Sequence, residues 1–255
     1  MRILLSLVGA LLLLPGLLHA AAPPVMPLEV EVVDARSGRT LPTWWHHGRL
    51  YLAGEPGLRY ALRVRNVTGR RLLAVVSVDG VNVLSGETAG VGQRGYVFEP
   101  GSAGTIDGWR KSLTETAAFY FTELPDSYAA RTGRDRHVGV IGIAVFEEYV
   151  PPVAIAPAER SEAAAPAGRS FERQASGMVQ DEARAAAPRL GTGHGERLHS
   201  VVATTSFRRA SMTPAALVTI RYDRLSALVA RGIVTPPEPI EPVPFPHAFV
   251  PDPEA

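Results

Sequence analysis

The sequence predicts a mainly β protein, an antiparallel β-sandwich that is immunoglobulin-like in style and carries one or two short helices. Three observations lead to this prediction. The apolar segments between residues 25 and 150 are short and rich in β-branched and aromatic residues, turn residues separate them at roughly even spacing, and hardly any stretch has the periodicity of a long amphipathic helix. Strands of this kind bury one face each and pack as two layers.

Ahead of this region, residues 1–20 have the pattern of a secretory signal peptide. Arg2 supplies a positive start, residues 3–18 form an almost unbroken apolar run, and small residues follow. We expect cleavage after Ala20 or Ala22, a periplasmic or secreted mature protein, and no transmembrane span after cleavage, because no later apolar stretch is long enough. An uncleaved membrane anchor is the alternative.

The first predicted strands alternate apolar and charged side chains. Residues 28–32 read Leu-Glu-Val-Glu-Val, and residues 59–65 place arginine and apolar side chains at alternate positions. A period of two predicts a strand with one buried face. Asp79-Gly80 stands between two runs of strand formers and predicts a tight hairpin, because both central positions of a type I′ turn need a positive φ.

Later segments complete the predicted sandwich. Residues 117–121 are rich in aromatic side chains, and residues 138–146 are apolar throughout, as is typical of a central strand covered on both faces. Residues 125–130 predict a short helix that begins at Pro125-Asp126 and ends at Gly133.

The composition changes after residue 150. Residues 151–190 are rich in Ala, Pro, Ser, Arg and Glu and hold few bulky apolar side chains, so they cannot bury enough surface to offset the entropy of ordering. We expect a mobile linker there. Residues 235–255 are rich in proline and predict an extended tail.

Residues 191–234, between the linker and the tail, predict a small strand–strand–helix unit. We expect paired strands at 199–208 and 216–222, followed by a helix over 224–231 that Asp223 caps. A unit of this size rarely folds alone, so its strands are expected to pack on or add to the sandwich.

Composition also limits the chemistry. The 255-residue chain has no cysteine, which excludes disulfides, thiolate metal sites and a thiol nucleophile. A net charge of +1 argues against a nucleic-acid partner. The sequence has no Gly-x-Ser-x-Gly elbow, no phosphate-binding loop and no Ser-x-x-Lys motif, and we expect neither a cofactor nor a metal.

Several segments together resemble a family of exported proteobacterial proteins. They are residues 59–66, 77–83, 108–110, 127–130 and 191–196. The likeness covers most of the mature chain outside the linker and the tail. No activity is established for that family, so the resemblance implies export and the fold and supplies no catalytic residue.

The most catalytic-looking segment is Gly-Thr-Gly-His-Gly-Glu at residues 191–196. Glycines free the backbone around His194, and Glu196 stands two residues away. On a loop, such a histidine is a candidate general base or metal ligand. The structural alternative is a glycine-rich hinge that leads from the linker into a strand.

Trp44-Trp45-His46-His47 is a second candidate. Adjacent side chains on a strand point to opposite faces, so one tryptophan would enter the core while the other is exposed. An exposed Trp45 beside histidine suits stacking on a sugar or transient binding of a metal ion. The favoured interpretation is that the pair anchors the core at the entry to a strand, because large aromatic residues dominate core burial.

Asp107-Gly108-Trp109-Arg110-Lys111 is a third candidate. An acid, an aromatic ring and two cations in one turn between strands would suit a polar ligand or a protein partner. In the structural alternative, Trp109 closes one end of the sandwich and Arg110 pairs with a neighbouring carboxylate.

These observations favour an exported, non-enzymatic binding module or envelope-associated accessory protein, with an envelope protein or a glycan as its partner. The alternative is a periplasmic hydrolase that uses His194 and Glu196, with Asp107 as a further acid. One feature separates the two hypotheses. A hydrolase needs His194 in a concave pocket against another titratable group, whereas a histidine without a partner in hydrogen-bond reach speaks against it.

Overall fold

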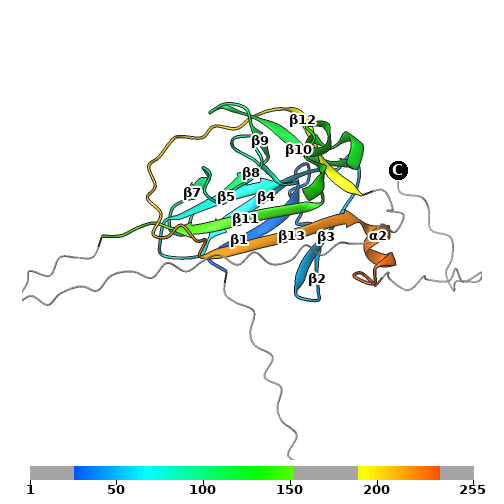
Figure 1. Ribbon diagram of the computed structural model, residues 1–255, viewed down its shortest axis with the longest axis horizontal. Coiled ribbons are helices and arrows are strands. Elements are labelled where there is room, and N and C mark those ends of the chain that lie inside the picture. Colours follow the sequence, from blue (N-terminus) through cyan, green and yellow to red (C-terminus); the bar gives the residue numbers. More distant parts are fainter. Residues whose placement is uncertain (1–25, 152–188, 236–255) are drawn as a thin grey trace, which may run out of the picture.

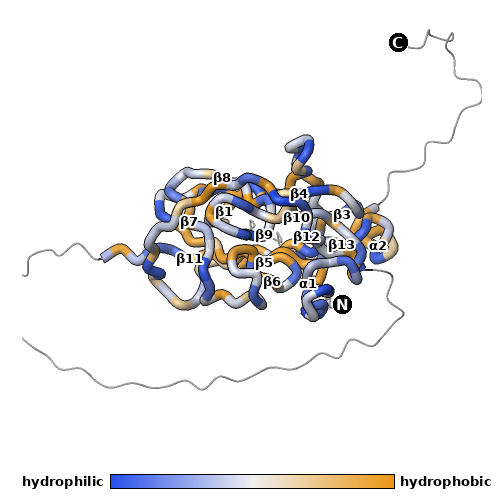
Figure 2. Tube along the Cα trace, turned by 90° about the horizontal axis from the view of Figure 1, so that it is seen from above, coloured by the Kyte–Doolittle hydropathy of each residue, from blue (hydrophilic) through white to orange (hydrophobic). Residues whose placement is uncertain are grey.

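The computed structural model describes residues 26–151 and 189–235, and it has two β-sheets packed face to face (Figure 1). The predicted mainly β sandwich is therefore confirmed. Seen from above, strands β4 and β8 lie in one layer and β5 and β11 in the other (Figure 2). The expected signal peptide, most of the linker and nearly all of the proline-rich tail lie outside the described residues.

The first sheet is antiparallel throughout. Its strands follow the order β1-β4-β10-β12, with β8 paired to β4 and β9 paired to β10. Their bounds are Leu28–Asp34 for β1, Arg59–Asn66 for β4, Ala103–Ile106 for β8, Gly108–Arg110 for β9, Glu115–Glu123 for β10 and Leu190–His199 for β12.

The second sheet is mixed. Its order is β2-β3-β13-β11-β5-β6, with β7 paired to β5, and β13 runs parallel to β3 while its other neighbour, β11, is antiparallel. The bounds are Thr43–His46 for β2, Arg49–Gly54 for β3, Leu72–Val78 for β5, Val81–Asn82 for β6, Tyr96–Phe98 for β7, Val140–Glu147 for β11 and Ala216–Arg224 for β13. The parallel pair departs from the purely antiparallel prediction, because β13 comes late in the chain and inserts between two earlier strands.

The helices are short, as the sequence predicts. The β10–β11 connection holds η1 (Leu124–Asp126), α1 (Tyr128–Arg131) and η2 (Asp135–His137), while α2 (Leu225–Ala230) follows β13 directly. The expected cap on α2 is wrong, because Arg224 occupies the N-cap and makes no side-chain capping bond. No helix within the described ranges is long and apolar enough to cross a bilayer.

The core lies between the two sheets and follows the predicted alternation. On β4, Tyr60, Leu62 and Val64 are buried, and so is Ala61. The three arginines of the strand, at positions 59, 63 and 65, are exposed. The apolar run on β11 is covered on both sides. Ile141, Ile143 and Val145 join the main core, and Phe146 belongs to a separate cluster on the outer face.

The C-terminal strands differ from their prediction. The glycine-rich segment 191–196, expected as a loop, lies inside strand β12, and residues 200–208, expected as strand, are not strand. β12 and β13 do not pair with each other, because β12 extends the first sheet while β13 lies within the second. The segment that the sequence groups as one unit is thus divided between the two layers.

Candidate functional site

The glycines around His194 permit close packing and do not free a loop. An added Cβ at Gly191 would lie 2.5 Å from the Cβ of Ser127 and 2.9 Å from Cγ1 of Val138, and one at Gly193 would overlap the ring of Tyr120. These neighbours occupy the space that a side chain would fill. The glycine spacing is therefore explained by packing against β10 and the helical connection.

His194 lies partly buried beside aromatic rings. Its ring centroid is 6.2 Å from that of Trp109 and 5.4 Å from that of Tyr128. Burial and the nearby cation of Lys111 lower the pKa of the imidazole below its usual value, which favours the neutral form. Within the described residues, no side chain forms a hydrogen bond with it.

Glu196 is held elsewhere. Both of its carboxylate oxygens accept from the guanidinium of Arg59, on the solvent-exposed side of the first sheet. His194 pairs in register with the buried Phe119, and the register of β10 and β12 shifts just beyond it, between Ala117 and Phe119. The structure does not join His194 and Glu196 into one site, so the geometry lends no support to the hydrolase alternative.

Residues 107–110 of the third candidate are built into the scaffold. Trp109 is 3% exposed and packs edge-on against Phe119, and its indole N–H has no partner within the described ranges. Asp107 accepts a 2.8 Å hydrogen bond from Thr116 Oγ1. These contacts match the structural alternative for Trp109, which leaves its ring out of reach of a surface ligand.

Among the described residues, Arg110 has no carboxylate partner of the kind that the structural alternative supposed. Its guanidinium donates to the backbone oxygen of Ser200, to Oγ of Ser200 at 3.2 Å and to the hydroxyl of Tyr96 at 3.3 Å. Through its hydrogen bonds to Ser200, Arg110 connects β9 to the segment that follows β12.

The two tryptophans of β2 have different surroundings. Trp44 packs against the cluster that contains Tyr51 and Leu228, whereas Trp45 is 71% exposed. The turn after β2 is a tight one, with positive φ at His47 (48°) and Gly48 (69°). Core anchoring therefore describes Trp44 and not Trp45.

Asp79 is a buried carboxylate, although its sequence pattern predicts only a turn. The turn itself is confirmed, with φ of 53° at Asp79 and 72° at Gly80. The carboxylate accepts from the hydroxyl of Tyr222 at 2.5 Å and from the backbone N–H groups of Gly139 at 2.9 Å and Thr192 at 2.8 Å. One side chain thus connects the β5–β6 turn to β12, β13 and the start of β11.

The hydroxyl groups behind Asp79 form a chain with a single consistent direction. Because Tyr222 donates its one proton to Asp79, Thr192 must donate to Tyr222, at 2.7 Å, and Tyr60 must donate to Thr192, also at 2.7 Å. All four side chains are buried. We call Asp79, Tyr222, Thr192 and Tyr60 the buried polar network, and its burial makes it a structural element.

Burial dominates the titration of this network. It raises the pKa of Asp79 to about 6, although the three donated hydrogen bonds favour the anion and oppose the shift. Burial also raises the pKa of Tyr60 and Tyr222 well above the usual tyrosine value, so both hydroxyls keep their protons. In the sequence, Asp79 is visible only as an acidic residue in a turn between two apolar runs. That pattern does not reveal its hydrogen-bond partners, which are distant in sequence.

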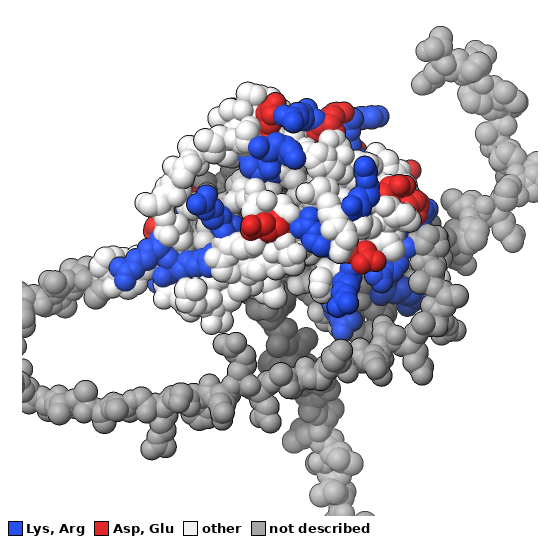
Figure 3. Space-filling view, turned by 45° about the horizontal axis from the view of Figure 1, so that its top comes forward, with Lys and Arg blue, Asp and Glu red and all other residues white. Residues whose placement is uncertain are grey.

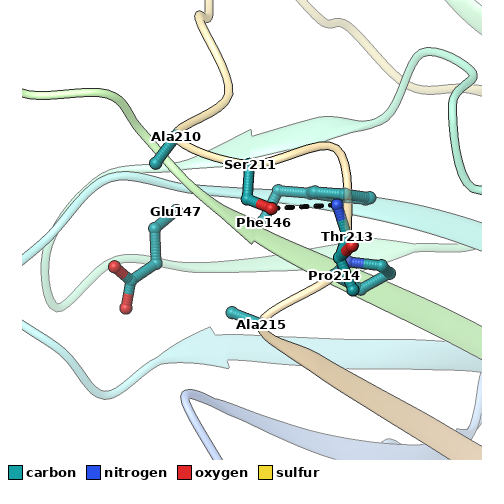
Figure 4. A pocket seen from close by; sticks show the side chains of 7 residues that line it. All are labelled: Phe146, Glu147, Ala210, Ser211, Thr213, Pro214 and Ala215. Atoms are coloured by element: carbon teal, nitrogen blue, oxygen red, sulfur yellow. Dashed lines mark hydrogen bonds between the residues drawn. The ribbon is translucent and has the colours of Figure 1, made fainter. Parts of the chain in front are cut away.

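Other hollows and clusters add no catalytic set. Figure 4 shows a shallow hollow where the loop 210–215 passes over the end of β11, and its one drawn hydrogen bond runs from Thr213 N to Ser211 Oγ at 3.0 Å. Glu147 at its edge is paired with Arg70 at 2.6 Å. Across residues 26–151 and 189–235, no group of three or more His, Asp or Glu side chains is placed to hold a metal ion.

Comparisons of the chain with protein-family models, with curated proteins and with solved structures find no match.

Proposed function

We propose that this protein is an exported, non-enzymatic binding module, and that the β2–β3 hairpin is its contact element for an envelope glycan. The observation that carries the proposal is Trp45, a large aromatic side chain that is 71% exposed on a short edge strand. Figure 1 shows β2 extending away from the body of the sandwich.

The hairpin combines an anchored side with a free side. Trp44 packs with Tyr51 and Leu228 and fixes the strand, while Trp45, its neighbour, stays in solvent. An indole ring held on a fixed strand offers a large contact area with little loss of conformational entropy on binding. The flat face of a sugar ring matches that surface, and the imidazoles of His46 and His47, with ring centroids 4.2 Å apart, supply polar groups for its hydroxyls.

The test is whether the full mature chain binds purified cell-wall sacculi and soluble oligosaccharides. Binding is measured by the change in tryptophan fluorescence. We expect Trp45→Ala to weaken binding about thirtyfold, because loss of a tryptophan anchor costs about 2 kcal/mol. Met212→Ala is the matched control, since Met212 is 76% exposed on another loop. Equal binding by wild type and Trp45→Ala would exclude the hairpin as the glycan contact.

Export is tested separately. Cell fractionation should recover a shortened chain outside the cytoplasm, and its N-terminal sequence should begin after Ala20 or Ala22. Recovery of the full-length chain in the cytoplasm would contradict the proposed location.

A further inference from the structure

A second feature is a pocket that does not include Trp45 but is lined by Tyr51, the register partner of Trp44 on β3. Its volume is about 440 Å³, within the range of small-molecule sites. Five segments form its walls: β3 at Tyr51, η2 with the start of β11, the start of β12, the second half of β13, and the residue after α2. All but β3 supply an arginine, namely Arg136, Arg189, Arg221 and Arg231.

The charge of this lining is strongly unbalanced. Beside the four arginines stands His137, and the single carboxylate among the lining residues is Asp223. Asp223 lies 3.8 Å from Arg231, whose guanidinium also stands 5.4 Å from the ring centre of Tyr51. Within the described residues, Arg136, Arg189 and Arg221 form no ion pair with a carboxylate. The pocket therefore holds three guanidinium groups that pair with no carboxylate of the described residues, and a fourth, that of Arg231, which pairs with Asp223.

Arg136, Arg189 and Arg231 are exposed, as solvated surface arginines are, whereas Arg221 is partly buried. β13 lies between β3 and β11, and Arg221 pairs in register with Tyr51 on one side and Val140 on the other. Its side chain is partly buried in the middle of a sheet. On the other sheet, by contrast, the arginines of β4 stand opposite glutamates that pair with them.

The walls of the pocket are also held in place from within. Asp79 accepts hydrogen bonds from the backbone N–H of Gly139 and from the hydroxyl of Tyr222, and both residues are among those that line the pocket. It also accepts from the backbone N–H of Thr192, two residues from the lining residue Leu190. His137 packs over the Asp79-Gly80 turn, because an added Cβ at Gly80 would lie 2.7 Å from the Cβ of His137. A site fixed by such contacts loses little entropy when a ligand enters.

We infer that this pocket binds a small phosphate-bearing molecule. Guanidinium groups present planar pairs of donors that match phosphate oxygens, and several of them around one cavity favour a multiply charged anion over a single carboxylate. The two proposals share Tyr51, which lines the pocket and contacts Trp44, but the arginines of the pocket are not part of the proposed glycan contact. Substitution of an arginine therefore tests this inference without changing Trp45.

Calorimetric titration of the full mature chain with pyrophosphate, inorganic phosphate and acetate tests the inference. We expect saturable binding of one pyrophosphate per chain, tighter than that of phosphate, no measurable binding of acetate, and an affinity that falls as salt is added. Arg136→Gln and Arg221→Gln should each weaken pyrophosphate binding about tenfold, because a hydrogen bond to a charged group contributes about 1.5 kcal/mol or more.

Arg65→Gln is the matched control, since it removes the same charge from the exposed face of β4, and it should leave the affinity unchanged. Circular dichroism and thermal unfolding are used to check that each variant folds. Arg221→Lys keeps the positive charge but not the planar guanidinium, and it should lose part of the affinity for pyrophosphate. Absence of saturable pyrophosphate binding, an equal loss in Arg65→Gln, or equally tight acetate binding would each overturn the inference.

Discussion

Two groups of polar side chains in this molecule use similar chemistry in opposite surroundings. The buried polar network places Asp79 among donors inside the core, with an exposed fraction of 0%. On the outer face of the first sheet, Glu29 and Glu31 of β1 stand directly opposite Arg65 and Arg63 of β4. We call this second group the exposed ion-pair ladder, and Figure 3 shows how acidic and basic side chains adjoin on the surface.

The difference lies in what each group would lose. Water replaces a broken bond at the surface, so an exposed ion pair contributes little to stability. A donor left unpaired in the core has no replacement, and its desolvation remains uncompensated. The ladder also joins two strands whose backbones are already paired, whereas the network joins segments as far apart in sequence as Asp79 and Tyr222.

The largest expected effect follows from removing the centre of the network. Asp79→Ala leaves the Tyr222 hydroxyl and the N–H groups of Gly139 and Thr192 without their acceptor. We expect the free energy of unfolding to fall by about 3 to 5 kcal/mol, measured by urea denaturation, because each unpaired buried donor costs about 1 to 3 kcal/mol.

Glu29→Ala, which removes a carboxylate from the ladder, is the control for that measurement. Its side chain is 60% exposed, and the ion pair with Arg65 spans 3.6 Å. If the two variants lose the same stability, the contrast between the network and the ladder does not hold.

The second prediction uses pH. The pKa of Asp79 is about 6 in the folded protein against its ordinary value of 3.8, because burial disfavours the anion. Between these values the folded state binds a proton that the unfolded state has released, so the contribution of Asp79 to stability rises as the pH falls from about 6 to about 4. The full shift corresponds to up to about 3 kcal/mol. Asp79→Asn should lose this pH dependence.

His194 acts in the opposite direction and must be separated from Asp79. Its pKa is lowered on folding, so the unfolded state takes up a proton first and stability falls as the pH drops below about 6.5. Comparing unfolding free energies of wild type and Asp79→Asn at about pH 5 and about pH 7.5 cancels the histidine contribution. An identical difference between the two proteins at both pH values would contradict the proposed titration of Asp79.

The same contrast explains how much of the fold the sequence could predict. Strands β4 and β11 were predictable because alternation and apolar runs report burial directly. Strand β12 was not, because its glycines suggest a loop, and only the positions of Ser127 and Tyr120 show why side chains are absent there. Contacts between residues distant in sequence leave no local signal.

The candidate sites show the same limit. Trp45 and Trp109 are the same residue type, yet Trp45 is 71% exposed and Trp109 is 3% exposed. The residues adjacent to each tryptophan in the sequence do not determine which of the two is buried. The turn pattern fully explains an aspartate at position 79, so the sequence gives no reason to expect that Asp79 is also the acceptor at the centre of the buried polar network. Arg136 and Arg221 are ordinary arginines in sequence, and only the meeting of η2 with β13 brings them to one pocket.

A smaller effect is expected within the network. Tyr222→Phe removes the donor to Asp79 and the acceptor for Thr192, whereas Tyr60→Phe removes only the last donor of the chain. We expect losses of about 2 kcal/mol and about 1 kcal/mol in unfolding free energy, respectively, because the first change breaks two buried hydrogen bonds and the second breaks one. The reverse order in urea denaturation would show that the network is not directional.

The smallest effect is expected in the ladder. Arg63 and Glu31 are each 45% exposed and lie 3.1 Å apart, so their interaction is largely screened by water. A double-mutant cycle with Arg63→Ala and Glu31→Ala should give a coupling energy of about 0.5 kcal/mol, and added salt should reduce it further. Because Asp79 is shielded from solvent, the loss of unfolding free energy caused by Asp79→Ala should change little over the same salt range. A salt-independent coupling in the ladder would mean that its ion pairs are held as firmly as the buried bonds, and the distinction between the two groups would fail.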